Sequence, residues 1–238
     1  MSIADRITRA KSDLNEVYNA GIEQGKQDEK DAFWNSYQNY GNRKNYDYAF
    51  YVKDSSGINI IWNENNFNPI YDIQPSSALH MFDGMGNFDL VKKLEELNVI
   101  LDFSNCNGLS YCFANSQLTH IGYVPFKTYA LNNVFSDCTH LHTIDEIAFR
   151  NGTSTVMSSA FKNFTSLANL KATGTISISI DFQYSPLLTL ESLQSIINAL
   201  KDYSETGSTY TLTLHTDAKA KLTEADIAII TQKGWTLA

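Results

Sequence analysis

The sequence predicts an α/β protein built as a solenoid of irregular repeats, with a helix before the repeats and an α/β module after them. One spacing of apolar residues around a phenylalanine recurs four times between residues 77 and 180. The start of the chain carries a helical apolar stripe, and its last part combines helical and alternating patterns. Because one copy of such a repeat is too small to bury its own apolar residues, we expect the copies to stack around one continuous core.

Residues 1–31 predict a helical segment for attachment or oligomerisation. Its apolar residues recur at alternating spacings of four and three, which places them on one side of a helix. They are Ile3, Ile7, Ala10, Leu14 and Val17. The stripe weakens at Gly21 after less than three heptads, so two interpretations stay open: an oligomerisation stalk, and a helix that packs on its own domain.

Residues 32–76 predict a first cap of the repeat stack, because they are rich in Asn and Tyr and poor in aliphatic side chains. Asn side chains compete for local backbone groups and favour turns over long regular elements. The aromatic residues of this segment are Trp34, Tyr37, Tyr40, Tyr46, Tyr48 and Trp62. Such rings can stack on sugars, but we favour the interpretation in which they form the core of the cap.

Residues 77–180 predict the repeat region. Each copy has an apolar or small residue four positions before its phenylalanine and apolar residues six and nine positions after it, with one residue deleted in the second copy. The four phenylalanines are Phe82, Phe113, Phe135 and Phe161. Their spacing lies in the range of leucine-rich repeats, so we expect the four rings to form one row along the core. The position three residues after the phenylalanine, filled by Met85, Cys138 and Phe164, is expected to be buried.

Residues 181–238 predict a helix–strand–helix cap. Thr189 stands where it can cap a helix over TLESLQSIINAL, and the strictly alternating TYTLTL predicts a strand. A last helix is expected to begin after Thr223, with Asp226 completing a capping box, and to end before Gly234. Because an end repeat must cover its apolar edge, we expect this module to close the solenoid.

Composition excludes several kinds of partner. The chain has 26 acidic and 18 basic side chains, a net charge of −8, which disfavours nucleic acid and anionic lipid surfaces. No apolar stretch approaches the roughly 20 residues that span a bilayer, and charged residues interrupt the first eleven positions where a signal peptide needs an apolar segment. We therefore expect no membrane insertion and no export signal. Three cysteines without a CxxC pair predict mostly free thiols, with at most one incidental disulfide.

The repeat strands supply the candidate partner-binding residues. In each copy, the residues that flank the buried strand position should face away from the core, on the concave side of the solenoid. These residues are His120, Thr143, Asp145, Asn169 and Lys171. Concave solenoid faces are frequent recognition surfaces, although many of their polar residues only interact with solvent.

The sequence predicts no catalytic, cofactor or metal site. His140 and His142 lie close to Cys138, but no fourth ligand accompanies them at a usual zinc spacing, so structural or surface histidines are the better interpretation. Asp145 and Glu146 are adjacent, and adjacent strand residues point to opposite faces, so we expect that these carboxyls do not form a catalytic pair. Nucleophile, phosphate-loop and zinc-protease motifs are absent from the sequence.

The spacing seen in VFSDCTHLHTI and AFKNFTSLANL resembles the irregular leucine-rich repeats of BspA-like bacterial surface proteins over about residues 78–175. The flanking segments, among them FWNSYQNYGNRKNYDYAF and ITQKGWTLA, are similar to proteins encoded by phages and prophages of gut Firmicutes, which are described as hypothetical or minor structural proteins. The resemblance implies an architecture and a gene context. It implies neither a ligand nor functional residues.

We therefore expect a non-enzymatic structural or adhesion protein of a bacteriophage virion, as a fibre or decoration of the tail or head. Its helical segment would bind other virion proteins and form a homo-oligomer such as a trimer, and its repeat face would bind a host surface glycan or protein. Two alternatives stay open. One is a BspA-like adhesin at the bacterial surface, or a scaffold in the cytoplasm. The other is a virion-associated polysaccharide depolymerase.

Overall fold

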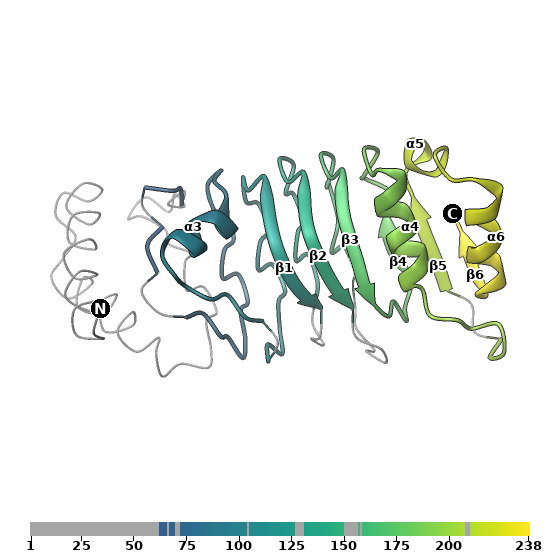
Figure 1. The fold of residues 1–238 in the computed structure, drawn as a ribbon, viewed down its shortest axis with the longest axis horizontal. Coiled ribbons are helices and arrows are strands. Elements are labelled where there is room, and N and C mark those ends of the chain that lie inside the picture. The colour runs from purple at the N-terminus through teal and green to yellow at the C-terminus, as the bar shows by residue number, and fades with distance from the viewer. Residues whose placement is uncertain are drawn as a thin grey trace, which may run out of the picture.

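The computed structural model describes residues 62–65, 67–69, 72–103, 105–126, 131–149, 157, 159–207 and 210–238. These residues form a mixed α/β structure with two small parallel three-stranded sheets, and the elements follow one another in chain order along one long axis (Figure 1). The predicted helical segment and most of the first cap lie outside the described residues. Within the described part, no helix is both long and apolar enough to cross a bilayer.

The central sheet consists of β1 (His120–Phe126), β2 (Thr143–Phe149) and β3 (Asn169–Gly174), paired in that order and all parallel. The first residues of the three strands are in register. The sheet therefore places equivalent residues of three copies side by side. Gly174 ends β3 at φ +74°, where a Cβ atom would lie 2.0 Å from the carbonyl oxygen of Phe149, so only glycine fits there.

The predicted row of phenylalanine rings is confirmed. Ring centroids lie 5.3 Å apart for Phe82 and Phe113, 5.5 Å for Phe113 and Phe135, and 5.9 Å for Phe135 and Phe161, with the rings stacked. A fifth ring, Phe182, lies 4.5 Å from Phe161 and continues the row into the segment predicted as the second cap. All five rings are buried. We call these five residues the phenylalanine spine.

Each of the first four spine residues lies in a tight turn between two left-handed residues. The left-handed residues two positions before the rings are His80, Tyr111, Asn133 and Ser159, and those two positions after them are Gly84, Asn115, Asp137 and Asn163. Gly, Asn and Asp adopt this conformation at low cost, which explains the composition of the second set. The backbone N–H groups of Phe82, Phe113 and Phe135 each donate to a carbonyl of the next copy, at 2.7, 3.0 and 3.0 Å. The stacked rings and the backbone hydrogen bonds therefore connect the same pairs of neighbouring copies.

The position three residues after the spine phenylalanine is buried, as predicted for Met85, Cys138 and Phe164. The Cys138 thiol donates to the carbonyl oxygen of Phe113, 2.9 Å away. Burial raises the pKa of Cys138 to about 12, which keeps the thiol protonated at physiological pH. Cys138 therefore fills space in the core and connects its own copy to the preceding one through a hydrogen bond. All three cysteines of the chain are buried free thiols, in agreement with the sequence prediction.

Two helices replace the strand in the end copies. Helix α3 (Leu90–Glu96) follows Phe82 and helix α4 (Leu190–Ala199) follows Phe182. Their N-caps, Asp89 and Thr189, each stand seven residues after the spine phenylalanine, directly before the position where the middle copies begin a strand. The side-chain oxygen of each cap accepts the backbone N–H three residues on, at 3.0 and 3.2 Å. The cap of α4 was predicted, whereas α3 was not.

Helix α4 satisfies the free edge of strand β3 through two serines. The Ser192 hydroxyl accepts the N–H of Leu170 at 2.9 Å and donates to the carbonyl oxygen of Ala168 at 3.1 Å. The Ser195 hydroxyl accepts the N–H of Ala172 at 3.0 Å. These side chains take the place of a fourth strand, so the sheet ends without unpaired edge groups at these positions.

Helix α3 lies along the other edge of the sheet, beside β1 (Figure 1). Gly122 of β1 makes this packing feasible, because a Cβ atom there would lie 2.7 Å from Cγ2 of Val91 in α3. Both edges of the central sheet are therefore covered by helices.

The second sheet consists of β4 (Ile180–Phe182), β5 (Tyr210–Leu214) and β6 (Trp235–Leu237), again all parallel. The predicted strand over TYTLTL is confirmed as β5. The two outer strands have three residues each and were not predicted. Such short strands leave no alternating pattern in the sequence.

Helix α6 (Glu224–Gln232) confirms the predicted last helix. Thr223 and Asp226 form the capping box, and Gly234 adopts φ +79° after the helix. A short helix, α5 (Thr216–Lys219), precedes it and was not predicted. The Lys233 ammonium group donates to three carbonyl oxygens at the end of α4, at distances of 2.8, 2.9 and 3.0 Å. These bonds tie the two helices together.

Replacing Phe135 with Ala should lower the free energy of unfolding by about 3–5 kcal/mol, because the removed ring contacts spine rings on both sides. Urea unfolding followed by circular dichroism measures the change. Leu187→Ala is the control, since Leu187 is 48% exposed and its loss should change stability by less than about 0.5 kcal/mol. Equal small effects of the two variants would contradict a core that depends on the spine.

Candidate functional site

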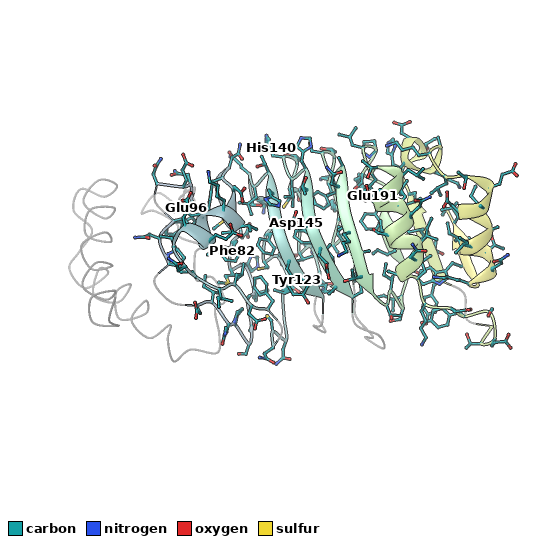
Figure 2. The ribbon with its side chains drawn as sticks, in the orientation of Figure 1. Phe82, Glu96, Tyr123, His140, Asp145 and Glu191 are labelled. Atoms are coloured by element: carbon teal, nitrogen blue, oxygen red, sulfur yellow. The ribbon has the colours of Figure 1, made fainter. Side chains whose placement is uncertain are left out.

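The five predicted contact residues lie on one face of the central sheet. His120, Thr143 and Asn169 begin the three strands in register, and Asp145 and Lys171 follow on β2 and β3. All five are exposed or half-buried, whereas the residues between them point into the core. We call this solvent-facing side of β1–β3 the open face. Asp145 of β2 and Tyr123 of β1 are labelled in Figure 2.

The prediction that Asp145 and Glu146 point to opposite sides of the sheet is wrong. Ile144 and Ile147 are both buried although they are three residues apart, and the pairing between β2 and β3 shifts register between them. This bulge leaves two consecutive residues outside the core instead of one. Both carboxylates therefore belong to the open face, where each contacts a different neighbouring strand.

His120 lies between two carboxylates. Its Nε2 atom is 2.9 Å from Oδ1 of Asp145 on β2, and its Nδ1 atom is 3.3 Å from Oδ1 of Asp89, the N-cap of α3. Burial by itself lowers the pKa of His120, but the hydrogen bond to Asp145 and the charges of both carboxylates outweigh it, so the pKa is raised above 6.5. Sequence analysis selected His120 and Asp145 but missed Asp89.

Glu146 joins strands β2 and β3 across the open face. One of its carboxylate oxygens is 2.9 Å from the Lys171 ammonium group, and the other accepts the hydroxyl of Thr173 at 2.8 Å. The hydrogen bonds from Lys171 and Thr173 lower the pKa of Glu146. The carboxylate is therefore held ionised and fixed in position.

Tyr123 is the aromatic residue of the open face and was also missed by sequence analysis. It lies on β1 in register with Glu146, and 47% of it is exposed. Its partial burial and the nearby charges of Glu146 and Asp102 raise the pKa of its hydroxyl group, so the phenol stays neutral. One signal was available in the sequence. IGYV and IDEI both place apolar residues three apart; in IDEI this leaves Asp145 and Glu146 outside the core, whereas in IGYV Gly122 is buried beside Val91 and Tyr123 is left outside.

The structure separates Cys138 from His140 and His142, which lie close together in the sequence. Cys138 is buried against Phe113, whereas His140 and His142 are exposed and precede strand β2. The His140 ring lies 3.3 Å from the hydroxyl of Thr139. Among the described residues, no three His, Cys, Asp or Glu side chains are grouped as metal ligands.

The open face offers an exposed phenol ring, paired charges and hydroxyl groups on a fixed backbone. Such a surface can hydrogen-bond to a polar partner and stack on a flat apolar one. Comparison with protein-family models, curated proteins and solved structures finds no match to the chain.

Lys171→Met should raise the pKa of Glu146 toward 4.5, because the variant removes the ammonium group that stabilises the carboxylate. A carboxyl whose pKa is lowered by folding adds stability above its unfolded pKa and loses it as the pH falls through the folded value. The loss of stability at pH 7 should stay below about 1 kcal/mol, since Lys171 is 64% exposed. Carbon-detected NMR titration of the side-chain carboxyl measures the pKa.

The matched control is Lys92→Met, because Lys92 pairs weakly with Glu96 at 3.9 Å on helix α3. It should leave the titration of Glu146 unchanged. If Lys171→Met also leaves it unchanged, the contact between Lys171 and Glu146 does not control the state of this carboxylate.

Proposed function

We propose that the chain is a leucine-rich-repeat-type solenoid that works as a non-enzymatic structural or adhesion protein of a bacteriophage virion, in a fibre or decoration of the tail or head. The open face is its recognition surface for a host glycan or protein. Residues 1–31 attach it to other virion proteins and join copies of the chain. The virion context comes from the resemblance of the repeats and their flanks to phage-encoded minor structural proteins.

One observation carries the recognition part of the proposal: equivalent positions of three copies have the same orientation. Ile121, Ile144 and Leu170 are buried, while the residues directly before them, His120, Thr143 and Asn169, lie outside the core in register. Parallel strands lie about 4.8 Å apart, so the outward residues form an evenly spaced array on a rigid support. Repeat proteins use extended surfaces of this kind to bind their partners.

The side chains of the open face fit the chemistry of a polar surface partner. The ring of Tyr123 can stack on the apolar face of a sugar or on a side chain of a protein. Glu146 lies beside Tyr123 in register and Lys171 contacts Glu146 from β3, so the two offer an acceptor and a donor for hydroxyl or amide groups. Their mutual contact holds both groups in place before a partner binds, which lowers the entropic cost of binding.

A polysaccharide depolymerase is the second candidate, because the bulge in β2 puts Asp145 and Glu146 on the same side of the sheet. Glycoside hydrolysis needs one carboxyl that is protonated and acts as an acid. Hydrogen bonds from Lys171 and Thr173 lower the pKa of Glu146, which is the opposite of what an acid requires. Asp145 is engaged by His120 at 2.9 Å. Binding without cleavage is therefore the better-supported activity.

Tyr123→Ala should weaken the binding of the purified chain to host cells at least about fivefold, because it removes the aromatic contact of the open face. Flow cytometry with the fluorescently labelled chain measures the affinity. Tyr184→Ala is the matched control: Tyr184 is also exposed, at 38%, but it follows β4, outside the central sheet. Equal binding by wild type and both variants would remove the open face as the recognition surface.

Two further measurements separate the alternatives. Mass spectrometry of purified virions should detect the chain, and its absence would favour the bacterial adhesin or scaffold. Incubation with host capsule or cell-wall polysaccharide should release no reducing ends. Release that Asp145→Asn or Glu146→Gln abolishes would establish the depolymerase instead.

Deletion of residues 1–31 should convert an oligomer into a monomer, because the deletion removes the whole predicted apolar stripe. Light scattering coupled to size-exclusion chromatography measures the mass. The phenylalanine spine begins at Phe82, so the shortened chain should keep its cooperative urea unfolding, which serves as the folding control. An unchanged oligomer mass would rule out this segment as the means of self-association.

A further inference from the structure

We propose that His120 is a proton-operated clasp that ties the beginning of helix α3 to strand β2 across β1, so that pH controls how firmly one border of the open face is held. The biological role of the clasp rests on the proposed recognition function of that face. The clasp itself is a property of three side chains, Asp89, His120 and Asp145, that come from three different elements.

Both ring nitrogens of His120 face a carboxylate oxygen. The distances are 2.9 Å from Nε2 to Asp145 and 3.3 Å from Nδ1 to Asp89. A neutral imidazole carries one N–H donor, whereas the imidazolium ion carries two. Only the protonated ring can donate to both carboxylates, so loss of the proton must break one of the two contacts.

The contact to Asp89 is the one that opens. It is the longer of the two, and the same Oδ1 atom of Asp89 also accepts the backbone N–H of Lys92 as the N-cap of α3. In the neutral ring, an unprotonated Nδ1 would direct its lone pair at this carboxylate, which is repulsive. Asp89 must then either turn away and leave the cap or move outward together with the first turn of α3.

The surrounding charges favour the protonated form of the ring. From α3 and its cap, the group that faces His120 is Asp89, while Lys92 pairs along the helix with Glu96 at 3.9 Å. From β2, Asp145 faces the ring. The pKa of His120 is accordingly raised above 6.5. A histidine whose pKa is raised by folding adds stability below its unfolded pKa and loses it as the pH rises through the folded value, so the clasp opens on the alkaline side.

Opening has a defined structural consequence. Helix α3 covers the edge of β1, where Val91 packs over Gly122. If the start of α3 loosens, the edge of β1 becomes accessible next to Tyr123 on the same strand. The clasp therefore couples the proton concentration to the border of the open face.

NMR titration of the full chain tests the clasp without any ligand. The His120 ring should titrate above 6.5, and both Asp89→Asn and Asp145→Asn should lower its pKa. Asn is also a good N-cap, so Asp89→Asn removes the charge while keeping the helix start. His142→Gln is the control, because His142 is exposed before β2 and should leave the titration of His120 unchanged.

Hydrogen exchange of the α3 amides supplies the second measurement. After correction for the intrinsic rates, protection should fall about fivefold as the pH rises through the His120 midpoint, the effect of one partly exposed charged hydrogen bond. In Asp89→Asn this step should disappear. The proposal is overturned if His120 titrates at or below 6.5, if neither Asn variant lowers its pKa, or if α3 shows no step. These results are independent of partner binding, so failure of the clasp and failure of the recognition function are distinguishable.

Discussion

The stacked phenylalanine rings are the interaction on which the rest of the structure depends. Their centroid distances of 5.3, 5.5 and 5.9 Å are close to the spacing of about 4.8 Å between neighbouring strands. Because the backbone N–H of the same phenylalanines bonds to the next copy, ring stacking and backbone pairing favour the same arrangement. A ring row fixes the register of the copies, and the register in turn decides which side chains meet on the open face.

A parallel sheet built in this way needs a defined end. Each added strand pairs with the previous edge strand but exposes its own unpaired N–H and C=O groups. The chain solves the problem by placing a helix at the strand position of the two end copies. The cap residue alone does not decide this, since Thr119 stands at the equivalent position in the second copy and a strand follows it. The segment after the cap decides: LVKKLEE is rich in helix formers, whereas HIGYVPF contains β-branched residues and a proline.

The polar contacts of the open face have a different role from those of the core. Ion pairs between exposed side chains add little stability, so the pair of Glu146 and Lys171 matters mainly because it fixes the position of both groups. The carboxylates on either side of His120 are likewise held in place, and this arrangement depends on the protonation of the imidazole ring. In the proposed recognition function, such a surface is organised before a partner binds, and the proposed clasp at His120 would make one of its borders adjustable.

Several features could be predicted because they depend on local patterns of residues. The phenylalanine row, the cap at Thr189, strand β5 and the capping box of α6 all follow from spacing and from residues within one or two turns of each other. The open-face positions of His120 and Lys171 were also predictable, because they flank buried strand residues.

Other features could not be predicted, because they arise from contacts between neighbouring copies. The bulge that turns Asp145 and Glu146 to the same side arises from the pairing of β2 with β3, and the short strands β4 and β6 exist only because they pair with β5. The contact between Asp89 and His120 is made by residues 31 positions apart in the sequence. No local pattern encodes such contacts, since they are created when backbone pairing brings separate copies into register.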